Sequence, residues 1–220
     1  MDFWNRNWYV IIKNAVSKDD CKAAENAIWN FIDATPDNRD SWYKNHPAKQ
    51  GIMIQFLRNP ALDKNRNSPK IRIAFEQLWN RKDLIVTTDR VSFNTPERSG
   101  YQFSGPYMHW DTSIHLPIPL GLQGILYLVD VQENQGAFTC VPGFHNKIEN
   151  WLKNLPAGTD PRGINFDSLG AKPIAANAGD FIIWHHALPH GSRPNTGDYP
   201  RIVQYIKWYP PDYADRRPWK

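Results

Sequence analysis

A histidine and an aspartate lie two positions apart, His109 and Asp111, in the segment GPYMHWDTSIHLP of residues 105–117. The segment has the residue pattern of an extended strand, in which side chains at positions i and i+2 point to the same face. The imidazole and the carboxylate can therefore converge on one point. Iron(II) accepts both kinds of ligand, and two histidines with one carboxylate occupy one face of its octahedron and leave the other positions open.

The third ligand of such a site should be a histidine far along the chain, on a strand that the fold brings alongside. Residues 179–208 offer His185, His186 and His190. The spacing of His186 and His190 would suit a zinc pair on a helix, but Pro189 between them and the strand-like residues before them argue against a helix. We expect His190, with His185 or His186 as the alternative if the strand register is shifted.

A candidate carboxylate-binding pair, Ser192 and Arg201, follows the third histidine. A guanidinium can hold a carboxylate through paired hydrogen bonds, and a serine hydroxyl supplies another donor. Arg193 is a competing carboxylate binder. We favour Arg201 because it opens the apolar strand IVQYI, where a buried guanidinium would need a fixed anion. An acidic co-substrate held there could reach back to the metal.

The chemistry-bearing residues fall within ordered motifs. These motifs are HWD at 109–111, GAFTCVPGFH at 136–145 and HGSRPNTGDYPR at 190–201. In this order they resemble the phytanoyl-CoA dioxygenase (PhyH)-like family of iron(II)- and 2-oxoglutarate-dependent oxygenases. The segment WYVIIKNAVSKDDCKAAENAI at 8–28 is also similar to the beginning of that family's domain, so the resemblance covers most of the chain.

The resemblance implies roles for individual residues. His109, Asp111 and His190 would be the catalytic metal ligands of iron(II), and Ser192 and Arg201 would grip the distal carboxylate of 2-oxoglutarate, with O2 as the other co-substrate. Because the carboxylate ligand is an aspartate rather than a small residue, a halide position on the iron is not implied.

The resemblance also implies a fold and a reaction. The fold would be a mainly β, double-stranded β-helix (jelly-roll or cupin) core with N-terminal helices, in a single domain over 1–220. The reaction would be hydroxylation or another oxidation of a C–H bond in a small organic metabolite, of natural-product or acyl type, with release of succinate and CO2. One departure is Ile125, on a strand where many relatives place tryptophan or another bulky residue near the pocket. The alternatives are an oxygenase acting on a macromolecule and a non-catalytic cupin-like module that binds a metal or a ligand.

The elements that must position these residues can be predicted from the pattern alone. A strand at the start precedes a helix capped by Ser17, and a second helix should begin at Ser68 with Pro69 in its first turn. From Leu84 onward short strand-like runs alternate with Gly, Pro, Asn and Asp, which indicates an all-β sandwich or barrel with helices before it. The predicted runs are 84–95, 107–116, 122–131, 136–143, 180–186 and 201–210. The long excursion 145–178 should hold a helix over 146–155 and could act as a lid.

The composition limits the expected location of the protein and its expected partners. The chain has 220 residues, is 41% hydrophobic and lacks both an apolar run of membrane-spanning length and a secretory signal pattern, so we expect a soluble cytoplasmic protein. Two distant cysteines indicate neither a disulfide framework nor a thiolate zinc site. The net charge of +4 is scattered and gives no clear nucleic-acid surface. We expect a monomer or homodimer that binds a small-molecule substrate.

Overall fold

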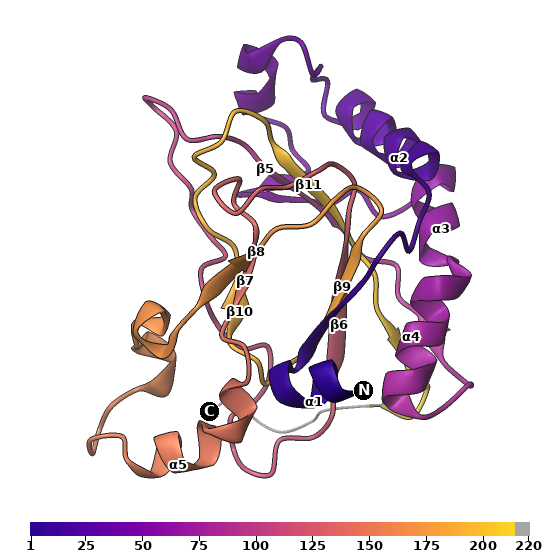
Figure 1. The fold of residues 1–220 in the computed structure, drawn as a ribbon. Coiled ribbons are helices and arrows are strands. Elements are labelled where there is room, and N and C mark those ends of the chain that lie inside the picture. The colour runs from indigo at the N-terminus through magenta and orange to yellow at the C-terminus, as the bar shows by residue number, and fades with distance from the viewer. Residues whose placement is uncertain (214–220) are drawn as a thin grey trace.

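Two β-sheets face each other at the centre of the molecule in the computed structural model, which describes residues 1–213 (Figure 1). The larger sheet has seven strands in the order β1-β9-β6-β11-β5-β3-β2, and the smaller has three in the order β10-β7-β8. This is the mainly β, double-stranded β-helix core that the resemblance implied. The strands of the larger sheet are β1 Tyr9–Ile12, β2 Lys49–Gln50, β3 Met53–Ile54, β5 Val91–Asn94, β6 Leu122–Tyr127, β9 Phe181–His185 and β11 Arg201–Tyr205. The smaller sheet consists of β7 Phe138–Cys140, β8 Lys172–Ile174 and β10 His190–Gly191, and β4 Ile85–Val86 pairs with β12 Trp208–Tyr209.

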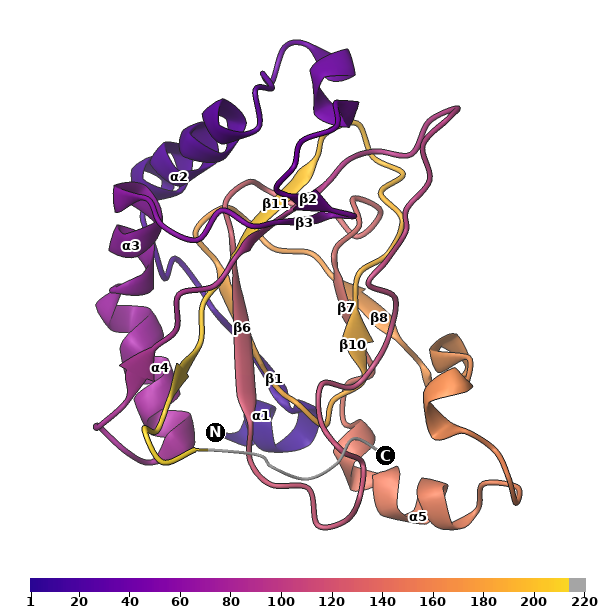
Figure 2. The same ribbon diagram turned by 180° about the vertical axis from the view of Figure 1, so that it is seen from behind.

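Helices α2, α3 and α4 cover the outer face of the larger sheet (Figures 1 and 2). The Ser17 hydroxyl caps α2 by accepting from the backbone N–H of Asp20, and Ser68 caps α4, whose first residue is Pro69. Both caps are where the sequence predicts them. The α-helices are α1 Asp2–Asn7, α2 Lys18–Phe31, α3 Pro60–Arg66, α4 Pro69–Trp79 and α5 Ile148–Lys153, and short 3-10 turns cover Arg39–Tyr43, Phe144–Asn146, Pro161–Gly163 and Phe166–Leu169.

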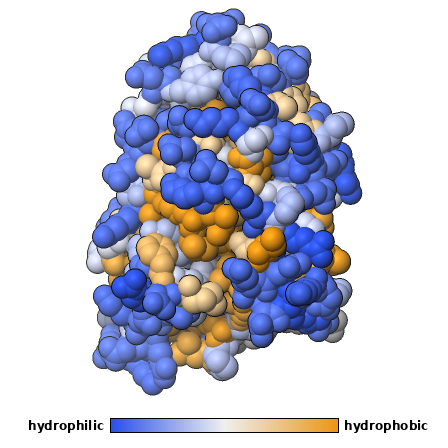
Figure 3. Space-filling view, turned by 45° about the vertical axis from the view of Figure 1, so that its right-hand side comes forward, coloured by the Kyte–Doolittle hydropathy of each residue, from blue (hydrophilic) through white to orange (hydrophobic). Residues whose placement is uncertain are grey.

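The apolar core has two parts, one on each face of the larger sheet. On β9, Phe181 and Ile183 pack toward the helices, whereas Ile182 and Trp184 pack between the two sheets. A strand buried on both faces reads as a continuous apolar run, as DFIIWHH does. On the face drawn in Figure 3, hydrophobic residues gather across the middle and hydrophilic ones frame them.

The predicted strand over 107–116 is wrong as a regular element. His109 exchanges both backbone hydrogen bonds with His190, and the pairing is an isolated bridge within a loop. The pairing does not continue beyond His109, and the carbonyl oxygens of Trp110 and Thr112 accept from the Arg162 guanidinium, at 3.1 and 2.7 Å. The local chain is still extended at His109, so the convergence of its side chain with that of Asp111 is retained.

The excursion after β7 lies beyond the smaller sheet (Figures 1 and 2). The helix predicted within it is confirmed as α5. Of the residues that the structure describes between 145 and 178, none lines the main cavity, so the structure does not support a lid there. Within residues 1–213, every helix falls short of the length and apolar character that crossing a bilayer requires.

Candidate functional site

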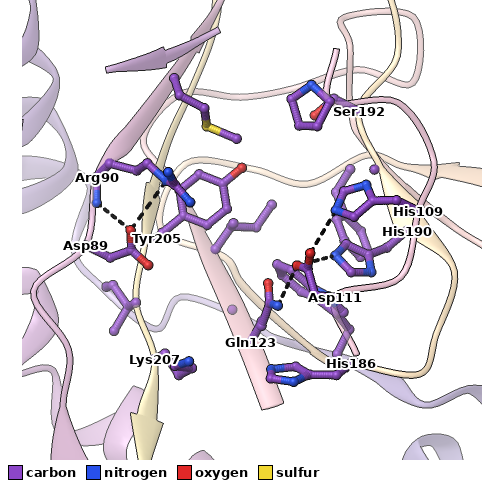
Figure 4. Close-up of a pocket in the computed structure, with 18 of the residues that line it drawn as sticks. Asp89, Arg90, His109, Asp111, Gln123, His186, His190, Ser192, Tyr205 and Lys207 are labelled. Atoms are coloured by element: carbon purple, nitrogen blue, oxygen red, sulfur yellow. Dashed lines mark hydrogen bonds and ion pairs between the residues drawn. The ribbon is translucent and has the colours of Figure 1, made fainter. Parts of the chain in front are cut away.

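A cavity of about 550 Å³ opens between the two sheets and brings together segments far apart in the sequence (Figure 4). Strands β6, β9, β10 and β11 contribute to its wall, together with the loop that carries HWD. Its polar lining residues include His109, Asp111, His190, Ser192 and Arg201. The residues singled out in the sequence therefore share one site.

The Asp111 carboxylate lies between two imidazoles (Figure 4). Its Oδ1 is 3.2 Å from Nε2 of His109, and its Oδ2 is 3.3 Å from Nε2 of His190. One ligand atom from each residue falls within 4.8 Å of the others. The structure thus forms the two-histidine, one-carboxylate cluster that the spacing predicted.

Backbone carbonyls fix the tautomers of both histidines. Nδ1 of His109 lies 2.6 Å from the carbonyl oxygen of Tyr107, and Nδ1 of His190 lies 2.9 Å from that of Leu188. A carbonyl can only accept, so each Nδ1 carries a proton, and in a neutral imidazole the lone pair of each Nε2 would then point at the carboxylate of Asp111. Two lone pairs cannot face a carboxylate at this distance without a cation between them. The donor set therefore fits a proton or a borderline divalent metal.

The electrostatics of the cluster also favour a cation. Burial raises the pKa of Asp111, but hydrogen bonds and charge from His109 and His190 outweigh it and hold that pKa far below its usual range. Burial lowers the pKa of His109, yet its contacts with Asp111 and the Tyr107 carbonyl raise it above its ordinary value. Each partner thus stabilises the charged form of the other.

Arg201 is buried beside the cluster, on the first residue of β11, and Ser192 is buried nearby. Arg201 donates from Nη2 to the Ser92 hydroxyl at 2.9 Å, while its Nε–H has no partner among the described residues. A buried guanidinium with unfilled donors is a strong site for an anion. Arg193 is engaged elsewhere, in an ion pair with Asp167.

Comparison with known proteins identifies the family. The model for phytanoyl-CoA dioxygenase (PhyH) matches residues 4–203, which is nearly the whole chain. The chain belongs to the PhyH family. A Dictyostelium discoideum protein named for phytanoyl-CoA dioxygenase is 25% identical, and the match covers 95% of this chain and 74% of that protein.

Solved structures show the same fold as this PhyH family member. The epimerase SnoN, in complex with Fe3+, alpha ketoglutarate and nogalamycin RO, matches with a TM-score of 0.68 and 16% identity, over 95% of this chain and 81% of its own. HygX from Streptomyces hygroscopicus, with nickel and 2-oxoglutarate bound, gives a TM-score of 0.69 and 14% identity, over 97% and 87%.

Gln123 is a site residue that the sequence interpretation of this PhyH chain missed. It lies on β6, two residues before Ile125, and both side chains line the cavity. Its Nε2 donates to Oδ2 of Asp111 at 2.6 Å. The period-2 alternation of a strand links Gln123 to Ile125 and was the available signal.

Tyr205 and Lys207 were also missed. They line the cavity at alternate positions after Arg201, on β11 and just beyond it. Strand alternation counted from Arg201 could have found them, since residues 201, 205 and 207 share a face.

The remaining histidines have other roles. His145 and His185 stack on Trp8, with ring centroids 4.1 and 3.9 Å from that of Trp8. His186 is buried and lines the cavity. Neither His185 nor His186 joins the cluster that includes Asp111, so the register-shifted alternatives are not supported.

Proposed function

We propose that this PhyH family protein is an iron(II)- and 2-oxoglutarate-dependent oxygenase that hydroxylates or otherwise oxidises a C–H bond of a small organic metabolite. The observation that carries the proposal is the convergence of two imidazole Nε2 atoms on one carboxylate, in a cavity that also holds a buried guanidinium with unfilled donors. The complexes of SnoN with Fe3+ and alpha ketoglutarate and of HygX with nickel and 2-oxoglutarate support it.

The residues divide into two groups by what they would hold. His109, Asp111 and His190 would hold iron(II), and Ser192 and Arg201 would hold the distal carboxylate of 2-oxoglutarate. When bound, the metal and 2-oxoglutarate supply the oxidation with O2, and succinate and CO2 are released. The protein supplies position, because each imidazole is fixed by its carbonyl partner.

The wall opposite the metal cluster supports a small polar substrate. Asp89, Arg90 and Tyr205 lie across the cavity from the cluster, and Lys207 lies below them (Figure 4). All four side chains can make hydrogen bonds. A cavity of about 550 Å³ is in the range that suits small molecules. These features favour a compact metabolite with oxygen or nitrogen groups over a long acyl chain.

The first experiment is an anaerobic titration of metal-free protein with iron(II) and then 2-oxoglutarate. We expect a weak visible charge-transfer band that requires both additions. No band, together with calorimetry showing that neither partner binds, would overturn the proposal.

A non-catalytic cupin-like binder is the competing function. Such a module would bind metal and 2-oxoglutarate but release no succinate on exposure to O2. Measurement of succinate against O2 consumption separates the two, and candidate small metabolites can then be screened for coupled turnover.

A further inference from the structure

Gln123 contacts Asp111, which has the fewest backbone contacts with regular secondary structure among the three candidate metal ligands. Asp111 lies in a loop, two residues beyond the isolated bridge that His109 forms with His190. The side-chain amide of Gln123 donates to Oδ2 of Asp111 at 2.6 Å (Figure 4). Hydrogen bonds to a charged acceptor are shorter and stronger than neutral ones, and this distance is slightly below the usual range of about 2.7–3.2 Å.

The backbone of Gln123, in contrast, belongs to a regular antiparallel ladder with β9. Strand β6 lies inside the seven-stranded sheet, between β9 and β11, and Gln123 is in register with Trp184 of β9. The Trp184 side chain is buried and packs against His190, with ring centroids 5.0 Å apart. Gln123 therefore connects the loop that carries Asp111 to a central strand of the larger sheet.

The carboxylate of Asp111 has three hydrogen-bonding neighbours among the described residues: the two histidine Nε2 atoms and the Gln123 amide. A metal held by His109 and His190 would use both Nε2 lone pairs, so the contacts between these atoms and Asp111 would be replaced. The contact from Gln123 can persist, because an amide N–H and a metal can bind different oxygens of one carboxylate.

We infer that Gln123 is a positioning residue for the metal site, which holds Oδ2 of Asp111 so that Oδ1 is presented to the metal. The inference rests on the proposed function. With one oxygen engaged by the amide, Asp111 binds the metal through the other oxygen alone. The coordination positions that the co-substrate requires then stay open. Outer residues of this kind typically contribute about 10- to 100-fold to metal affinity.

Cobalt(II) binding tests this inference without turnover. Calorimetry and the visible cobalt(II) spectrum are measured for the wild type, Gln123→Met and Gln123→Asn. Methionine fills a similar volume without a donor, and asparagine keeps the amide but is one methylene too short to reach. We expect both variants to bind cobalt(II) about tenfold or more weakly. We also expect an altered absorption band, because the carboxylate is free to turn.

A matched control is Gln77→Met, which makes the same chemical change on the exposed face of α4. It should leave the affinity and the spectrum unchanged. A purely structural role for Gln123 would lower the melting temperature of the metal-free protein and leave the cobalt(II) affinity of the folded fraction unchanged, and that result would overturn the inference. If the wild type bound no cobalt(II), the proposed function would fail instead, so the two failures are distinguishable.

Discussion

Arg193 forms a two-point ion pair with Asp167, in which Nη1 lies 3.0 Å from Oδ2 and Nη2 contacts Oδ1. Neither residue lines the main cavity, and Asp167 belongs to the excursion that follows β7. Arg201, in contrast, is buried and lines the cavity, so we keep Arg201 rather than Arg193 as the proposed carboxylate anchor.

Replacing Arg201 by glutamine should weaken 2-oxoglutarate binding strongly. Removing one partner of a buried, hydrogen-bonded charge pair costs about 2 kcal/mol or more, which corresponds to a loss of affinity of about 30-fold. Calorimetric titration of the cobalt(II)-loaded protein measures it. Arg193→Gln is the matched control and should stay within about threefold of the wild type. Equal losses in the two variants would contradict the assignment of Arg201.

Removing a metal ligand should abolish metal binding and leave the fold intact. In Asp111→Ala or His190→Ala, a three-residue donor set loses one member, and the affinity loss should exceed the about 100-fold that outer residues contribute. The Asp111 side chain is 32% exposed, so its removal opens no large core cavity. Calorimetry with cobalt(II) measures the binding, and circular dichroism verifies the fold. Activity at the wild-type level in either variant would refute the metal-ligand assignment.

Arg162 should stabilise the loop that carries Asp111. Its guanidinium donates to the carbonyl oxygens on both sides of that residue, those of Trp110 and Thr112. In Arg162→Met these carbonyls lose charged donors, each worth about 1.5 kcal/mol or more. Hydrogen exchange measured by mass spectrometry should become faster in the peptide that spans 107–116. Arg72→Met, which removes an exposed guanidinium from α4, serves as the control, and equal exchange in the two variants would contradict the prediction.

His185 should make stability depend on pH below neutrality. Burial is the main cause that lowers the pKa of this imidazole, to about 3. The unfolded chain, with a histidine pKa of about 6.5, therefore binds a proton that the folded chain excludes, so stability falls as pH drops from about 6.5 toward 3. The slope attributable to one such group is up to about 1.4 kcal/mol per pH unit.

The matching measurement is urea unfolding at several pH values for the wild type and His185→Phe. The phenyl ring can still stack on Trp8 but cannot titrate, so the variant should show a flatter slope between pH 6.5 and the acid transition. It should also be about 1 kcal/mol less stable at pH 7, because the backbone N–H of Ala187 loses its acceptor. His46→Phe leaves His185 in place and should keep the wild-type slope. An unchanged slope in His185→Phe would refute the prediction.

Much of the fold could be predicted from local rules. The helices that begin after Ser17 and Ser68 follow from their caps, and β9 follows from its continuous apolar run. Helix α3 was missed, although Asn59 caps it and Pro60 is its first residue, which is the same signal that revealed α4. A seven-residue helix is too short to show a clear apolar periodicity, so its cap was the available signal.

The candidate site also has features that the sequence predicts and features that it does not. The ligand types and their order in the chain are readable because the chemistry restricts them to histidine and aspartate. The loop conformation around Asp111 was not readable, because it depends on a guanidinium contributed by Arg162 from a distant segment. For Gln123, strand alternation with Ile125 could indicate the cavity-facing side, but not the contact with Asp111, because Asp111 lies in a loop whose position the sequence pattern does not fix.

The isolated bridge between His109 and His190 links metal binding to the stability of the folded protein. It joins two segments that are far apart along the chain, and a metal held by both histidines would act as a removable cross-link that closes the long loop between them. A metal that binds only the folded state stabilises that state. The free energy of unfolding should therefore rise as the free metal concentration exceeds the dissociation constant of the site. Gly191 makes the junction possible, since a Cβ at that position would lie 2.5 Å from the carbonyl oxygen of Tyr107. The supply of metal would then set the lifetime of this protein as well as its activity.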